Sequence, residues 1–373
     1  MAIFFHLLNL FTTGSLLLNS FLLLSKPNKN NKKATYWLSL FLFWLSIIFF
    51  EECFKVLGLP TDDTVAVEIF SLPLFVIAPT FYLSVQYFIR PHQKLKKTDA
   101  LHLLPFFFYI TFLAGVAVFF PKNTILISPQ FWGDFISVAI TLLLFSQIVV
   151  YLLLSLKIIH IHQKNVQLYS ANVEGIDLSW LQWLIYGVFF MVLLWIFQIL
   201  FPEVPDFASV GYFLAVYYLA YFTLNQKEIY PFTEKETHNV LEIIEDTGEK
   251  SGKVVLPSDL VIEMTKLNEL MRKEKPYLDN ELSLPKLSAQ LQTRRHQVSY
   301  LLNKGFNENF YDYVNRHRVE ESKKLLMDKK LKHLSLVGIA FEAGFNSKTA
   351  FNTAFKKFTG KTPSEFRKAN TPA

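Results

Sequence analysis

Residues 335–363, SLVGIAFEAGFNSKTAFNTAFKKFTGKTP, decide the fold of the C-terminal third of this chain. Ser335 can cap the start of a helix, and Gly344 can adopt the backbone conformation that a tight turn needs. The two helices that flank this turn each carry apolar side chains at spacings of three and four residues, so each should bury one face. These side chains are Ile339, Ala340 and Ala343 in the first helix, and Phe351, Phe355 and Phe358 in the second.

The second of these helices has a polar face opposite its phenylalanines. That face consists of Lys348, Thr349, Asn352 and Thr353, with Lys356 and Lys357 near the end of the helix. Such a face, presented on a short helix after a tight turn, suits the major groove of DNA. Residues 335–359 therefore predict a helix-turn-helix unit.

The same arrangement occurs earlier in the chain, over residues 283–304. Ser283 can cap a short helix with Leu284, Leu287 and Leu291, and Gln292-Thr293 forms the turn. The second helix, over residues 294–304, should bury Val298, Leu301 and Leu302. Its other face should present Arg295, His296, Ser299 and Tyr300, with Arg294 at its start. A longer helix over residues 308–328 joins the two units, so each unit offers one helix to a major groove.

The charge of this part of the chain fits a nucleic-acid partner. From residue 282 to the end there are 17 Lys and Arg and 7 Asp and Glu, a net charge of +10. Basic side chains at this density can neutralise phosphates, and binding of that kind weakens as salt rises. Docking on anionic lipid is the alternative that charge alone leaves open.

The motifs in this region resemble those of the AraC/XylS family of transcription regulators. The resemblance rests on IAFEAGF at 339–345, on FYDYVNRHR at 310–318, and on Phe351, Phe355, Gly360, Pro363, Phe366 and Arg367. It covers residues 276–368, and it implies two recognition helices that enter successive major grooves. It also implies base contacts from His296, Ser299 and Tyr300, with Arg295 nearby, and from Lys348, Thr349, Asn352 and Thr353. Lys356 and Lys357 would then bind phosphates.

The sequence departs from the family pattern at a few positions. Asn307 stands where glycine is usual, and asparagine tolerates the left-handed backbone conformation, so we expect the loop to survive. Tyr300 and Thr353 stand where arginine is common in relatives. The resemblance therefore does not give the base specificity.

Residues 225–275 form an acidic linker between the two main parts of the chain. From 225 to 281 there are 13 acidic and 8 basic residues. Within the linker, residues 260–273 predict a helix with Leu260, Met264, Leu267 and Met271 on one face. That face needs a partner, which either the following domain or a second copy of the chain would supply.

The first 224 residues are typical of a multi-pass membrane domain. The whole chain is 51% hydrophobic with a mean hydropathy of +0.27, and all 6 Trp and 29 of the 38 Phe lie in this part. A membrane-spanning helix needs about 20 apolar residues. The sequence predicts seven spans, at residues 3–24, 36–50, 65–89, 101–120, 131–159, 180–201 and 207–224, separated by polar or proline-bearing breaks.

The distribution of Lys and Arg in the loops predicts the orientation of these spans. Loops one, three and five carry 10 of them and the opposite loops carry 2. Positive loops face the cytoplasm, so we expect the N-terminus outside and the C-terminus in the cytoplasm. The outer side is acidic, and Glu68, just inside a predicted span, is the candidate ligand-binding residue there because a carboxylate in a membrane is costly.

The sequence as a whole predicts an all-α protein with three parts. These are a seven-helix transmembrane domain (1–224), the acidic linker (225–275) and an AraC-type helix-turn-helix domain (276–373). We expect a membrane-anchored one-component transcription regulator in the cytoplasmic membrane, which senses an unknown signal. The alternative is a membrane receptor or transporter-like protein whose helix-turn-helix module makes protein contacts only.

The expected partners follow from this interpretation. They are double-stranded promoter DNA, the lipid bilayer, RNA polymerase, a second copy of the chain and an unidentified signal ligand. No catalytic motif of a common enzyme class is found, so we expect no enzyme activity, no cofactor and no metal. The single cysteine, Cys53, cannot form an internal disulfide.

Overall fold

The computed structural model describes residues 2–27, 31–56, 72–91, 93–119, 129–174, 176–201, 203, 207–224 and 257–370. Over these residues the secondary structure is helical, with no strand beyond one isolated bridge between Ser170 and Ser283. The prediction of an all-α fold is therefore confirmed. The chain divides into two compact units, one of residues 1–160 and 178–231, the other of residues 161–177 and 232–373.

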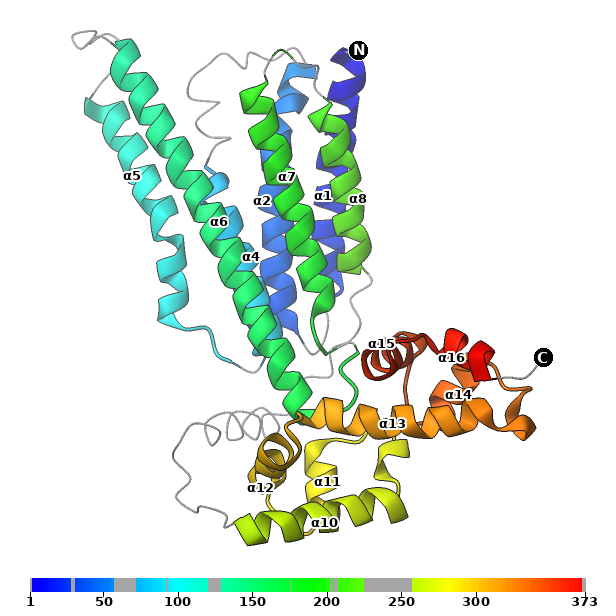
Figure 1. Ribbon diagram of the computed structural model, residues 1–373. Helices are drawn as coiled ribbons and strands as arrows, with labels where there is room; N and C mark the ends of the chain where they lie inside the picture. The colour runs from blue at the N-terminus through cyan, green and yellow to red at the C-terminus, as the bar shows by residue number, and fades with distance from the viewer. Residues whose placement is uncertain are drawn as a thin grey trace. The chain divides into compact units, whose positions relative to one another are not determined.

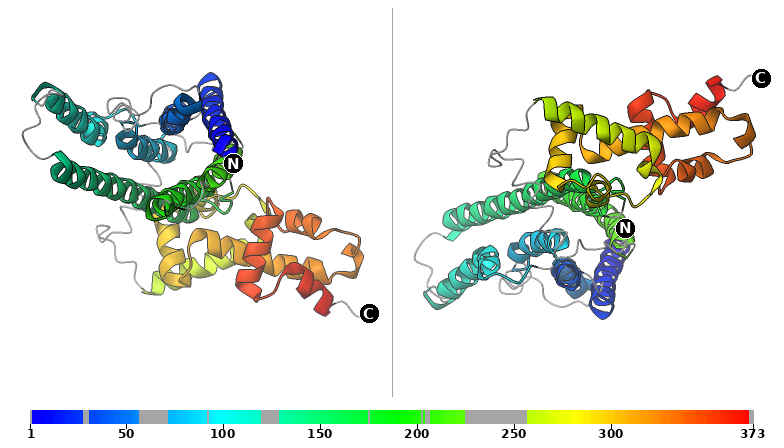
Figure 2. Two further views of the ribbon diagram at one scale, coloured as in Figure 1. Left: turned by 90° about the horizontal axis from the view of Figure 1, so that it is seen from above. Right: turned by 90° about the horizontal axis from the view of Figure 1, so that it is seen from below.

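Unit 1 is a set of long apolar helices that run alongside one another (Figures 1 and 2). Its helices are α1 (Ala2–Ser25), α2 (Lys32–Val56), α4 (Leu74–Ile89), α5 (Leu104–Phe119), α6 (Pro129–Tyr169), α7 (Ser179–Leu200) and α8 (Ala208–Leu224), with a 3₁₀ turn η1 (Lys97–Leu103) before α5. The last residues of α6, from Ile161 on, belong to unit 2.

Small and polar side chains hold the helices of unit 1 together. Asn19 on α1 donates to Thr223 Oγ1 on α8 at 2.7 Å, and Ser20 on α1 donates to the Ser39 carbonyl of α2 at 2.8 Å. On α8, Gly211 lies so close to Leu194 of α7 that a Cβ there would overlap its side chain. Close backbone approach and hydrogen bonds between helices are typical of packing inside a bilayer.

The outer surface of unit 1 is compatible with a membrane. Among the described residues, four helical stretches are long and apolar enough to cross one: Ile3–Ser25, Lys32–Phe50, Val138–Tyr169 and Ser179–Leu200. Large apolar side chains are exposed on several helices, among them Phe4, Phe11, Phe21, Leu142, Leu153, Phe189 and Leu193. Exposed apolar surface of this extent marks an interaction with a membrane or a partner.

The number of spans stays a prediction. The helices Leu74–Ile89 and Ala208–Leu224 are apolar but shorter, and the predicted span at 65–89 is described only in its second part, as α4. Glu68, the predicted ligand-binding residue, lies outside the described residues.

Unit 2 is organised around one central helix, α13 (Phe310–Met327), which lies lengthwise across the view in Figure 1. Before it come α10 (Pro257–Lys273), the 3₁₀ turn η2 (Pro276–Leu278), α11 (Leu284–Gln290), α12 (Arg295–Tyr300) and the π-helical segment η3 (Leu301–Phe306). After it come the 3₁₀ turn η4 (Lys329–Leu331), α14 (Leu336–Glu342), α15 (Lys348–Thr359) and α16 (Pro363–Asn370).

Two hydrophobic cores share α13. Phe310, Tyr313 and Val314 on its first half pack with Leu284, Leu287 and Val298 of α11 and α12. Val319 and Leu326 on its second half pack with Ile339, Phe351 and Phe355 of α14 and α15. The first core also contains Leu267 and Met271, so the following domain supplies the partner that the apolar face of α10 needs. Each core belongs to one helix-turn-helix unit.

Candidate nucleic-acid interface

The second helix-turn-helix unit, residues 335–359, has well-defined helix ends, and its sequence predicts the Ser335 cap and the Gly344 turn. Ser335 Oγ accepts a hydrogen bond from the Gly338 amide at 3.0 Å and caps α14. Gly344, at φ +89°, makes the turn to α15. Ser347 Oγ accepts from the Ala350 amide at 3.1 Å and caps α15. These contacts satisfy backbone groups that helix ends leave unpaired, and they fix where α15 begins.

The first helix-turn-helix unit, residues 283–304, differs from its predicted form in two details. Ser283 precedes α11, but its side chain makes no capping hydrogen bond. Its backbone takes part instead in the bridge with Ser170. The second helix has six α-helical residues, 295–300, and then widens into η3. Asn307 ends this segment at φ +54°, the left-handed conformation that the sequence predicts.

The joining helix α13 is tied to both units by ion pairs. Arg316 donates to Glu308 through Nε at 2.9 Å and through Nη2 at 3.0 Å. Lys357 Nζ, on α15, lies 2.6 Å from Asp312 Oδ1 near the start of α13. Bidentate arginine–carboxylate pairs are the stronger ones, so the start of α13 is held firmly beside η3.

Comparison with known proteins supports what this geometry indicates. A family model described as a helix-turn-helix domain matches residues 287–369. Residues 287–369 form a helix-turn-helix domain of the AraC type. The Msm operon regulatory protein of Streptococcus mutans is 32% identical over 89 residues, which is 24% of this chain and 31% of that protein. The chain thus matches about a third of the length of this curated relative.

One solved structure is similar in sequence to part of the chain. It is a protein of unknown function from Listeria innocua, 31% identical, covering 28% of this chain and 95% of that one with a TM-score of 0.25.

Helix α15 exposes most of the side chains that the sequence predicts to contact DNA. Lys348, Thr349, Thr353 and Lys356 are exposed, and Asn352 is half-buried. Phe351 and Phe355 on the opposite face are fully buried. Lys357 is also exposed, but its ammonium group pairs with Asp312, so in this conformation it ties α15 to α13.

The shorter helix α12 of the AraC-type domain presents a smaller face than predicted. Arg294 and Tyr300 are exposed, and Arg295 and His296 are half-buried. Ser299, expected on the same face, is only 4% exposed. It directly follows the buried Val298 and lies one turn before the buried Leu302, so it belongs to the edge of the inward face.

Among the described residues, Arg318 has the largest side chain that is almost fully buried, and nothing in the sequence singles it out. It is 1% exposed, and its Nε and Nη2 donate to the carbonyls of Tyr277 and Asp279, both at 2.8 Å. Burial lowers the pKa of Arg318 to about 10, so the guanidinium keeps its charge at neutral pH. Its acceptors are backbone carbonyls, which a sequence does not reveal.

His317, next to Arg318, should make the stability of the AraC-type domain depend on pH. Burial, with the nearby charge of Arg316 as the second cause, lowers the pKa of His317 to about 4. An unfolded histidine has a pKa of about 6.5. Between these values the unfolded chain binds a proton that the folded domain excludes, so stability should fall as pH is lowered from about 6.5 towards 4.

We expect His317→Phe to remove much of this pH dependence, because a phenylalanine side chain cannot bind a proton. Phe can also keep the stacking on Tyr277, whose ring lies 5.6 Å from that of His317. The measurement is hydrogen–deuterium exchange of the α13 amides at pH values between 4 and 7, corrected for intrinsic rates. His333→Gln, a change at an exposed histidine, is the control. An equal loss of protection in His317→Phe and wild type would contradict the prediction.

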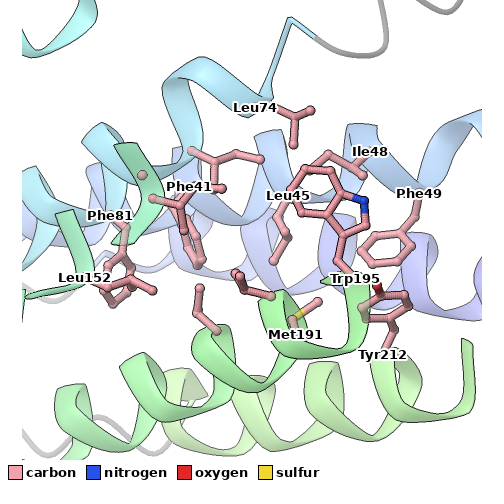
Figure 3. Close-up of a pocket in the computed structure, with 15 residues that line it drawn as sticks. Phe41, Leu45, Ile48, Phe49, Leu74, Phe81, Leu152, Met191, Trp195 and Tyr212 are labelled. Carbon is pink, nitrogen blue, oxygen red and sulfur yellow. The ribbon is translucent and has the colours of Figure 1, made fainter. Parts of the chain in front are cut away.

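A second candidate site lies inside unit 1. A cavity of about 340 Å³ is lined by mostly apolar side chains from five helices, and Figure 3 draws these side chains as sticks. Phe41 and Leu45 come from α2, Phe81 from α4, Leu152 from α6, and Met191 from α7. Trp195 and Tyr212 add ring groups with polar atoms, and Tyr212 packs against Phe49 at 5.2 Å. The size falls within the range of small-molecule sites.

Proposed function

We propose that this protein is a membrane-anchored one-component transcription regulator. The observation that carries the proposal is α15: a capped helix with a buried aromatic face and an exposed polar and basic face, within an AraC-type domain. The part of the same chain that the structure describes also contains four helices long and apolar enough to cross a membrane. Both helix-turn-helix units would contact DNA, in successive major grooves.

The orientation in the membrane follows from the loop charges. The N-terminus lies outside and the AraC-type domain lies in the cytoplasm, where it can reach the chromosome. RNA polymerase and a second copy of the chain are further proposed partners. The predicted division at residues 224 and 275 separates the membrane domain, the linker and the DNA-binding domain.

The cavity of unit 1 is the proposed binding site for the signal molecule. Its lining favours a largely apolar small molecule, with polar groups limited to those that Trp195 and Tyr212 can contact. A hydrocarbon-rich ligand would reach such a site from within the bilayer. The alternative function, a receptor or transporter whose helix-turn-helix module binds protein only, predicts the same cavity but no selective DNA binding.

The test of the proposed function uses the full-length protein in lipid nanodiscs. Random DNA duplexes are selected for binding, and the affinities of the enriched sequences are compared with those of a scrambled control at a fixed salt concentration. Selective regulators bind their sites at least about 10³-fold more tightly than other DNA. Equal affinity for all sequences would reject the proposal and favour the alternative.

Two substitutions on α15 should separate base contacts from phosphate contacts. Asn352→Ala should cost about 1–3 kcal/mol on the selected site and relax selectivity at one base pair. Lys356→Ala should weaken binding to all sequences alike and reduce the salt dependence by about one ion. Titrations at several salt concentrations measure both, and Asn370→Ala on α16 is the control. A loss of selectivity from Lys356→Ala alone would contradict this division.

A further inference from the structure

The backbone that follows α6 lies against the first helix-turn-helix unit, within unit 2. Ser170 forms an antiparallel bridge with Ser283, and the Ala171 amide donates to the Leu282 carbonyl at 3.3 Å. Tyr169 and Ala171 are 6% and 3% exposed and belong to the same core as Leu282 and Tyr313. A segment more than a hundred residues away in sequence thus completes the core of the first unit.

The segment keeps its shape through its own hydrogen bonds. Ser170 Oγ donates to the Asn172 carbonyl at 2.7 Å, and the Glu174 amide donates to Asn172 Oδ1 at 3.1 Å. His162 Nε2 and the Ile176 carbonyl lie 2.7 Å apart, which ties the returning chain to the end of α6. The segment is therefore a formed loop that can dock as one piece.

Arg318 connects this loop to both helix-turn-helix units. Its Nη1 donates to the Ala171 carbonyl at 3.3 Å and to Asn315 Oδ1 at 3.2 Å. Its other nitrogens bind the Tyr277 and Asp279 carbonyls of the first unit. Its guanidinium carbon lies 5.8 Å from the centre of the Phe345 ring, in the turn before α15. The buried guanidinium of Arg318 thus contacts the loop and both helix-turn-helix units.

The two units also touch beside Arg318. A Cβ on Gly344 would overlap the Tyr277 carbonyl oxygen and come within 2.8 Å of Leu278 Cα. The turn that positions α15 is therefore packed against η2. Loss of the loop would remove one acceptor from the buried charge of Arg318 and open the core next to this joint.

We propose that Leu282, Ser283 and Arg318 form a docking surface for the loop of residues 169–172 of the same chain, and that the docked loop holds the two helix-turn-helix units in one fixed arrangement. This inference rests on the proposed function and assigns its regulation. Because α6 is continuous from Pro129 to Tyr169 and also lines the cavity of unit 1, movement of α6 would change docking. The docked form binds two grooves at a lower entropic cost.

A disulfide tests the docking surface directly. Residues opposite each other in an antiparallel pair have Cα atoms about 4.5–5.5 Å apart, which a disulfide can span. In the full-length protein with Cys53→Ser, the pair Ser170→Cys and Ser283→Cys should cross-link on mild oxidation. A protease site inserted after Gly252 lets a gel report the linkage. Ser170→Cys with Lys368→Cys, on an exposed position of α16, is the control pair and should not cross-link.

The effect of docking is measured on DNA with matched charge variants. Ala171→Lys places a charge in the buried contact, and Glu174→Gln makes the same change of net charge at an exposed position two residues beyond the loop. Ala171→Lys should weaken binding to a duplex with both sites about tenfold, because the second contact loses effective concentration. Binding to a duplex with only the second unit's site should stay unchanged, and Glu174→Gln should behave as wild type on both.

Each outcome decides the inference. No cross-link between positions 170 and 283, or a cross-link as strong in the control pair, overturns the docking surface. A cross-link together with equal two-site affinity of Ala171→Lys and wild type overturns its regulatory role. Equal loss on the two duplexes also overturns it, because that indicates general damage to the domain. Absence of selective binding in every form rejects the proposed function instead, and the cross-link still decides the docking.

Discussion

Phe351→Ala is expected to unfold the second helix-turn-helix unit or to leave it barely stable. Phe351 is 0% exposed, and its ring lies 5.2 Å from Phe345 and 5.5 Å from Phe355. Removing a buried phenylalanine side chain from a well-packed core costs about 3–5 kcal/mol. Since a whole domain is stable by only about 5–15 kcal/mol, little would remain.

The measurement is hydrogen–deuterium exchange of the α14 and α15 amides in the full-length protein, followed with DNA affinity. The matched control is Phe341→Ala on α14, because Phe341 is 54% exposed. That control should change the free energy of unfolding by less than about 1 kcal/mol. If both variants lose protection to the same extent, Phe351 does not hold the core as the structure places it.

Gly344→Ala is expected to have the second large effect. At φ +89°, an alanine would be strained by about 1–3 kcal/mol. Its Cβ would also overlap the backbone of Tyr277 and Leu278, which adds a similar cost because backbone atoms cannot move aside as a side chain can. We expect a total of about 2–6 kcal/mol and a changed position of α15.

Gly360→Ala provides the comparison for this substitution. Gly360 ends α15 at φ +74°, and nothing lies within 4 Å of a Cβ placed there. It should therefore show backbone strain alone, about 1–2 kcal/mol. Chemical denaturation followed by exchange of the α15 amides measures both variants. Equal destabilisation by the two would mean that the contact between the Gly344 turn and η2 contributes nothing.

Much of unit 2 could be predicted because its signals are local. Apolar spacing, the Ser335 cap, the Gly344 turn and the left-handed Asn307 each depend on neighbours a few residues away, and the structure has all four. The helical class of unit 1 followed from hydropathy in the same way. The exposed face of α15 was predictable for the same reason, since the buried Phe351 and Phe355 leave the opposite face for Lys348 and Thr349.

Two residues predicted to contact DNA lie where packing decides between faces, and their DNA contacts stay predictions. Ser299 is polar and was assigned to the exposed side, but its neighbours Val298 and Leu302 place it at the edge of the core. Lys357 was assigned to phosphate, but Asp312, which lies 45 residues away in sequence, pairs with it. Polarity alone could not distinguish a solvent-facing side chain from one with a partner inside the fold.

The contacts of Arg318 and the loop at 169–172 could not have been predicted from periodicity. The acceptors of Arg318 are carbonyls at Tyr277, Asp279 and Ala171, groups that every residue carries. Neither Tyr169 nor Ala171 differs in kind from its neighbours in the sequence. Only three-dimensional closure brings a position 147 residues away to Arg318.

The membership of Tyr169 and Ala171 in the first core has a consequence for how this protein is made and dissected. Both residues leave the ribosome long before Phe310 and Tyr313, so the first core is complete only when late-synthesised helices pack against an early segment. A fragment that starts after α8 lacks these two side chains and exposes the surface they cover. The compact unit that contains the helix-turn-helix domain, residues 161–177 and 232–373, is therefore discontinuous in the gene.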